Sequence, residues 1–221
     1  MDGGKQGRLD QREISDWETT HVGLPQEGWV CPSAPKPVRL PYGQVGTSGT
    51  VNSAEVWVWP PYPPTNRVSS YGLNDWLGGS RRLAGTSDPV FSSRLSMDQL
   101  KGFFYDHESQ LIQSSLTPIL ADAVITSDLG GPLPWEKPAL DPVYGGLNGG
   151  GYSGVMAQFT IPRHGNRLSP QPKQWDISKP LSGAINVGFF DGSARQVPLE
   201  QLWQLYWSAD WQPPAKRPGL K

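Results

Sequence analysis

The chain has 221 residues, long enough for one sizeable domain, and its 19 basic and 20 acidic residues give a formal net charge of −1. The charges are spread without long runs, which argues against a nucleic-acid or anionic-membrane surface. Only 36% of the residues are hydrophobic, while 26 Gly and 23 Pro favour turns and short strands over long helices. Ten tryptophans offset the shortage of aliphatic residues, so we expect an aromatic core that includes Trp29, Trp76 and Trp203.

Residues 1–28 are polar and Gly-rich, and we interpret them as a lead in front of the folded domain. The first β-prone run covers residues 55–59 and ends at a cluster of prolines. If it is a strand, Trp57 and Trp59 share one face, because side chains two residues apart point the same way. Such a pair fits either a packed core or an exposed platform that stacks on sugar rings, so both alternatives stay open.

The middle of the chain combines one helix with two strands. A capping box at residues 96–99 predicts a helix from residue 97 to about residue 105, with its aromatic residues buried. Residues 117–125 and 155–161 are predicted strands, the second ended by Pro162. Strands and helices do not alternate regularly, which favours an antiparallel sheet. We therefore predict an α+β fold with few short helices and long Gly/Pro-rich loops.

The last third predicts a β-hairpin followed by a helix. Residues 184–190 alternate between apolar and small or polar side chains, and residues 194–197 form the return strand. Between them, Asp191-Gly192 supplies the positive φ angles of a two-residue turn. Pro198 suits the first position of a helix that runs to about residue 206. Residues 208–221 form a Pro-rich C-terminal tail.

Several short motifs occur in a recognisable order along residues 29–207. They are Cys31-Pro32-Ser33, Ser70-Tyr71-Gly72-Leu73-Asn74, Pro118 with Asp122, Arg163-His164-Gly165, and Asn186-Val187 with Phe189 and Asp191-Gly192. In this order they resemble the C-terminal domain of prepilin-type pseudopilin-like proteins, which are abundant in planctomycetes, verrucomicrobia and lentisphaerae. That family carries a histidine followed at a distance by Asp-Gly.

The resemblance has two departures. The 26 residues between His164 and Asp191 exceed the usual gap of the family, so residues 166–182 are a predicted inserted loop. A pseudopilin also begins with a basic leader and about 20 apolar residues that span a bilayer, and these 221 residues contain no such run. Either the chain was cut behind that helix or the natural product lacks it.

The resemblance implies that residues 29–207 are the globular head of a structural subunit of a type II secretion or type IV pilus-like system. Its partners would be other pilin-like subunits, bound through the N-terminal helix that is missing here. That helix would also be its only membrane contact. The resemblance places the domain in the cell envelope, on the periplasmic or extracellular face. In the family the sheet packs against this helix, so one apolar sheet face needs another cover or lies exposed.

Asp122, His164 and Asp191 match characteristic positions of the family and form the candidate metal site. Carboxylates suit Ca²⁺, and an imidazole among them suits a transition metal better. Related pseudopilins carry a structural Ca²⁺, which the resemblance makes a possible cofactor here. The alternative is a hydrogen-bonded histidine beside a turn-forming aspartate. In either case these residues, with Asn186 and Gly192, are expected to hold the shape of the domain.

The sequence gives no sign of an enzyme. It has no nucleophile signature, no His-Glu-x-x-His and no phosphate-binding loop. Cys31 is the only cysteine and forms no intrachain disulfide, so it is either a buried thiol or a residue whose partner lies in the missing segment. The alternative function is an envelope or extracellular carbohydrate-binding module that uses Trp57 and Trp59.

Overall fold

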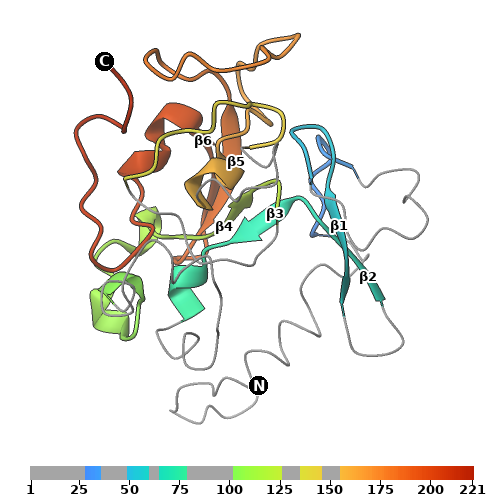
Figure 1. Cartoon of the computed structure of the whole chain (residues 1–221). Coiled ribbons are helices and arrows are strands. Elements are labelled where there is room, and N and C mark those ends of the chain that lie inside the picture. The colour runs from blue at the N-terminus through green and yellow to red at the C-terminus, as the bar shows by residue number, and fades with distance from the viewer. Residues whose placement is uncertain (1–27, 36–48, 60–64, 79–101, 126–134, 146–154) are drawn as a thin grey trace.

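The protein contains a four-stranded antiparallel sheet and a two-stranded ribbon, and only Ser70 separates the last strand of the ribbon from the first strand of the sheet (Figure 1). The computed structural model describes residues 28–35, 49–59, 65–78, 102–125, 135–145 and 155–221. The strands are β1 (Glu55–Trp59), β2 (Thr65–Ser69), β3 (Tyr71–Leu73), β4 (Pro118–Asp122), β5 (Ala184–Phe189) and β6 (Ala194–Pro198). The 3₁₀ helices are η1 (Asp75–Gly78), η3 (Glu108–Gln110), η4 (Ser114–Leu116), η5 (Val155–Phe159) and η6 (Leu199–Gln204).

The predicted α+β fold with short helices is confirmed. β1 pairs with β2, and the larger sheet has the order β3-β4-β5-β6, with every pair antiparallel. The predicted strands at residues 55–59, 184–190 and 194–197 are present within one residue at each end. None of the helices in the described part of the chain is long and apolar enough to cross a bilayer.

β5 is one of the two inner strands of the four-stranded sheet, and the alternation of its side chains explains how the core forms. Ile185, Val187 and Phe189 are buried on one face, while Asn186 and Gly188 lie on the other. The buried face packs against η5, η6 and the segment that follows η6. The apolar cluster there includes Phe159, Leu199, Leu202, Trp203 and Trp207.

The opposite side of the sheet is less covered. We call it the second sheet face, formed by Tyr71, Leu73, Leu120, Asn186 and Gly188. Leu73 pairs with Leu120 and Leu120 pairs with Gly188, so these residues lie in one row across three strands. All five residues are half-buried.

The turn between β5 and β6 differs from the predicted two-residue turn. Gly192 donates to the carbonyl of Phe189 at 3.0 Å, and Phe189 donates to that of Ser193 at 2.8 Å. Only Gly192 has a positive φ, of 83°, so the loop has three residues with a left-handed glycine at its end. Asp191 has a negative φ. Its carboxylate accepts hydrogen bonds from the backbone N–H and the hydroxyl of Ser193, and these bonds stabilise the turn.

Two predicted elements change type. Residues 155–159 form the 3₁₀ helix η5, so the strand predicted for 155–161 is wrong. Met156 and Phe159, three residues apart, are both buried, and a short apolar run does not distinguish a strand from a helical turn. The helix predicted after Pro198 is the 3₁₀ helix η6, with Pro198 preceding its first residue. Of the predicted helix 97–105, residues 97–101 lie outside the described ranges and residues 102–103 are helical.

The aromatic core is confirmed for Trp76 and Trp203, which are fully buried, whereas Trp29 is only half-buried. Trp76 forms a second cluster with Phe103 and Phe104, with ring centroids 5.3 and 4.9 Å apart. The predicted burial of these two phenylalanines is therefore correct.

The loop at residues 165–183 and the C-terminal tail are both fixed to the body. His164 and Ala184 exchange two backbone hydrogen bonds of 2.8 Å, which close the neck of the loop. Arg217 is buried, bonds Glu200 of η6 at 2.8 Å and donates to the carbonyl of Lys179 at 2.6 Å. The tail therefore packs on this loop and on η6.

The core face of β5 gives a stability prediction. Ile185 is 0% exposed and Ile112 is 67% exposed, so Ile185→Ala and Ile112→Ala remove the same atoms from a packed and an open site. We expect Ile185→Ala to lower the free energy of unfolding by about 2–5 kcal/mol and Ile112→Ala to change it by less than about 0.5 kcal/mol. Urea denaturation measures both. Equal effects would contradict the position of β5 in the core.

The hydroxyl of Tyr105 gives a pH prediction. It donates a hydrogen bond to the carbonyl of Tyr206 at 2.9 Å. Burial raises the pKa of Tyr105 to about 12. A hydrogen bond with Thr117 lowers this pKa, and the charge of Asp210 raises it further. Since the folded protein holds this proton more tightly than the unfolded chain, the stabilisation is complete below about pH 10 and is lost as the pH rises toward about 12. We expect Tyr105→Phe to flatten this alkaline fall in urea denaturation, and the exposed control Tyr144→Phe to leave it unchanged.

Candidate functional site

Arg163 is the centre of a buried polar cluster that joins distant segments of the chain. Its guanidinium donates five hydrogen bonds, to the carbonyl oxygens of Thr50, Val51, Ser70 and Ala123 and to Oδ1 of Asp122. All five of its N–H groups therefore have a partner. Burial lowers the pKa of Arg163, and the adjacent carboxylate of Asp122 opposes that effect. The side chain stays charged, because arginine remains protonated in proteins.

Asp122, the last residue of β4, balances this charge. Its Oδ1 lies 3.3 Å from Nη1 of Arg163, and both side chains are fully buried. Its Oδ2 accepts a 2.6 Å hydrogen bond from the backbone N–H of Asn186 in β5. A buried carboxylate needs such partners, because an unpaired charge is expensive to remove from water. The ion pair therefore links β4, β5 and the segment that follows η5.

His164 follows Arg163 and places one ring nitrogen among three polar groups. Its Nε2 lies 3.0 Å from Nδ2 of Asn186, 3.1 Å from Oδ2 of Asp122 and 3.2 Å from Sγ of Cys31. The side chain is 17% exposed, so this group lies just beneath the surface. The imidazole is thus held from three different segments of the chain.

Cys31 enters the cluster from the N-terminal part of the described chain. It is 1% exposed, and its backbone N–H donates to Oγ of Ser70 at 2.6 Å. Its side chain also forms a hydrogen bond with Tyr71 of β3. The pKa of Tyr71 rises to about 12, chiefly through burial and then through the charges of Asp122 and Cys31 and this hydrogen bond. Together Cys31, Asp122 and His164 present one sulfur, one oxygen and one nitrogen within 4.8 Å of one another.

The predicted metal residues are only partly brought together. Asp122 and His164 are adjacent, and Asn186 of the predicted structural motif joins them. Asp191 and Gly192 instead lie in the exposed turn beyond the other end of β5, roughly 15 Å away at the rise of a strand. Hydrogen bonds from Ser193 lower the pKa of the Asp191 carboxyl. Asp191 is therefore a turn residue, and Cys31 takes its place in the cluster.

This cluster does not fit the Ca²⁺ that the resemblance implies. Ca²⁺ takes roughly six to eight oxygen ligands, whereas the atoms that converge here are a sulfur, an imidazole nitrogen and one carboxylate oxygen. The second oxygen of Asp122 is engaged by Arg163. The donor set is one that transition metals prefer.

The arrangement also differs from a catalytic cysteine dyad. In such a dyad the nucleophile contacts one imidazole nitrogen and the orienting group holds the other. Here Sγ of Cys31 and Oδ2 of Asp122 both face Nε2 of His164. The thiol is also almost completely shielded from solvent.

The proposed sugar-binding pair remains a prediction. Trp57 and Trp59 lie in β1, opposite Arg67 and Thr65 of β2. The alternation of the strand gives them a common face. Their side chains are outside the described part of the structure.

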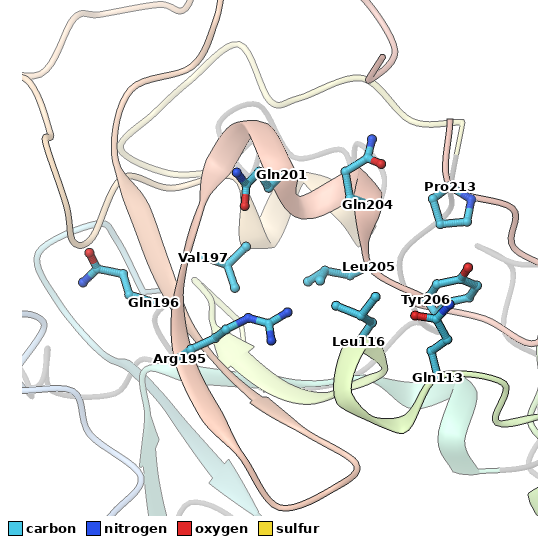
Figure 2. Close-up of a pocket in the computed structure, with 10 residues that line it drawn as sticks. All are labelled: Gln113, Leu116, Arg195, Gln196, Val197, Gln201, Gln204, Leu205, Tyr206 and Pro213. Atoms are coloured by element: carbon cyan, nitrogen blue, oxygen red, sulfur yellow. The ribbon is translucent and has the colours of Figure 1, made fainter. Parts of the chain in front are cut away.

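A shallow cavity of about 450 Å³ lies between β6, η4 and η6 (Figure 2). Figure 2 shows Arg195 and Val197 of β6 on one side and Leu116 and Tyr206 on the other. The Arg195 guanidinium also stacks 4.2 Å above the Phe189 ring. None of the ten described residues that line the cavity is a carboxylate, a histidine or a cysteine, so these residues provide no acid–base pair.

Sequence reasoning missed the two ends of this network. In the sequence, Arg163 stands out only as the first residue of the Arg-His-Gly motif. The one hint that it is buried is its position directly after an apolar run that ends at Pro162. Cys31 and His164 are 133 positions apart, and no local pattern predicts such a contact.

Comparison with protein-family models, curated proteins and solved structures finds no match to this chain.

The buried ion pair gives a third stability prediction. Arg163→Leu leaves the Asp122 carboxylate buried without its cation, and we expect a loss of about 3–5 kcal/mol in the free energy of unfolding. Arg167→Leu, at an exposed arginine whose guanidinium donates a surface hydrogen bond to Asn52, should cost less than about 0.5 kcal/mol. Chemical denaturation at neutral pH compares the two. A loss below 1 kcal/mol for Arg163→Leu, on the order of a surface contact, would contradict the central role of this residue.

Proposed function

We propose that this chain is the non-enzymatic globular head of a pseudopilin-like subunit of a type II secretion or type IV pilus-like system. The observation that carries the proposal is that the separate motifs of the resemblance meet in one buried network. Cys31, Ser70, Asp122, Arg163 and Asn186 come from five segments and are connected by hydrogen bonds. Residues with this role specify a fold, which is what a family of structural subunits has in common.

Asn74, from the same motif as Ser70, supports the proposal in a second place. Its Nδ2 donates to the carbonyls of Pro118 and Trp207, both at 2.9 Å. It thereby joins the end of β3 to the start of β4 and to the segment after η6. The motif residues therefore hold segments of the chain together and do not line an open site.

The second sheet face supports the filament role. The resemblance implies a sheet with one face packed against an N-terminal helix. Leu73, Leu120 and Gly188 form a half-buried apolar row on this face, of the kind that a helix covers. The opposite face already carries the core.

The geometry around His164 supports the non-enzymatic part of the proposal. The sulfur of Cys31 and the carboxylate of Asp122 face the same nitrogen of His164, which differs from a catalytic base that contacts its nucleophile through one ring nitrogen and its orienting group through the other. A substrate also has no direct access to a thiol that is 1% exposed.

Localisation in the source cells tests the proposal. An antiserum against the purified chain is used on cytosol, membranes and sheared surface material after chemical cross-linking. We expect the protein in the membrane or sheared fraction, in cross-linked species that contain other small subunits with an apolar N-terminal helix. Antiserum absorbed with the purified chain is the control.

A protein found in the cytosol at the mass of a monomer, with no cross-linked subunits, would refute the filament role. Titration of the purified chain with polysaccharides, followed by tryptophan fluorescence, covers the alternative. A saturable shift that Trp57→Ala and Trp59→Ala abolish would assign the chain to carbohydrate binding instead.

A further inference from the structure

We propose that Cys31, Asp122 and His164 form a structural site for a divalent transition metal, with Zn²⁺ as the best fit. Their ligand atoms come from three separate segments and lie within 4.8 Å of one another. Thiolate, imidazole and carboxylate are the three donor types that bind Zn²⁺ in proteins. This proposal is independent of the filament role, because it depends only on these three residues and their surroundings.

The hydrogen-bonding capacity of His164 carries the argument. Nε2 of His164 has either one proton or one lone pair, yet it faces a carboxylate oxygen, a sulfur and the amide of Asn186 at 3.0–3.2 Å. If Nε2 is protonated, its single N–H serves Oδ2 of Asp122 or Sγ of Cys31 but not both. If it is not, its lone pair faces that of Asp122 Oδ2. A cation at the centre of the group satisfies the nitrogen, oxygen and sulfur lone pairs together.

The distances fit such a cation. With Zn–N, Zn–O and Zn–S bonds of ordinary length, tetrahedral ligands are separated by about 3.3 Å for nitrogen and oxygen and by about 3.6 Å for sulfur and nitrogen. The corresponding separations here are 3.1 Å and 3.2 Å. Outward shifts of a few tenths of an ångström open the site, and the partly exposed edge at Asn186 and His164 gives the metal a way in.

The surroundings hold the ligands in place, as in known metal sites. Arg163 and the backbone of Asn186 fix the Asp122 carboxylate so that one oxygen points to the site. The hydrogen bond from Tyr71 supports the sulfur of Cys31. The Asn186 amide lies 3.0 Å from Nε2 of His164, and since its oxygen and nitrogen exchange by a simple rotation, Oδ1 or a solvent molecule would supply the fourth ligand.

A bound metal would cross-link separate segments of the chain. It ties the Cys-Pro-Ser segment to the end of β4 and to the neck of the 165–183 loop. Hydrogen bonds already join these segments, so the metal adds to an existing structure instead of creating it. We therefore expect the metal-free chain to fold and the metal to raise its melting temperature.

Cobalt substitution tests the site without any variant. The full chain is stripped with a chelator and titrated with Co²⁺, and then Zn²⁺ is added in competition. Because Cys31 is the only cysteine, a sulfur-to-cobalt charge-transfer band can come from this residue alone. We expect one Co²⁺ per chain, with this band and the intense visible bands of tetrahedral cobalt, both displaced by Zn²⁺. Titration without a charge-transfer band, or no saturation by equimolar metal at micromolar protein, would overturn the proposal.

Matched variants locate the ligands. Cys31→Ser should abolish the charge-transfer band, and His164→Gln should weaken Zn²⁺ binding at least about tenfold. His107→Gln, at an exposed histidine, is the control and should bind like the unaltered chain. Circular dichroism checks that each variant is folded. Unchanged Zn²⁺ affinity in a folded His164→Gln variant would place the metal elsewhere and refute the site.

Discussion

The buried guanidinium of Arg163 is the constraint on which the rest of the structure depends. Folding removes a full positive charge from water here, and the cost is offset only when five acceptors arrive from separate parts of the chain. Four of them are backbone carbonyls, so the requirement fixes the course of the chain around residues 50, 70 and 123. These hydrogen bonds therefore specify one course of the chain in a small domain rich in Gly and Pro, whose short strands alone do not specify it.

Features set by a local pattern were predictable from the sequence, whereas the contacts of this network were not. The β5–β6 hairpin was predictable because Ile185, Val187 and Phe189 alternate with smaller residues, and this period is a property of the strand itself. The strand predicted for residues 155–161 is wrong because a short apolar run fits a strand and a helical turn equally well. Asp191 was placed with His164 because both belong to one motif, but β5 separates them. The partnership of Cys31 with His164 spans 133 positions and was beyond any local pattern.

The proposed function and the proposed metal site concern the same cluster at two levels. The motif residues act as structural ties in the hydrogen-bonded network, and a metal would strengthen the tie nearest the surface. With Cys31 in place of Asp191, the candidate ligands change from two carboxylates and an imidazole to one carboxylate, one imidazole and one thiolate, a set that suits Zn²⁺ better than Ca²⁺. The two proposals are compatible, because the metal site depends only on Cys31, Asp122 and His164 and their surroundings.

The structural role of Arg163 requires that its guanidinium be buried and fully hydrogen-bonded in solution. NMR of the arginine guanidinium protons, assigned by comparison with Arg163→Lys, tests it most directly. We expect separate, slowly exchanging Nη protons for Arg163, because carbonyl acceptors on both sides block the rotation of its guanidinium. Averaged, rapidly exchanging signals like those of an exposed arginine would contradict it.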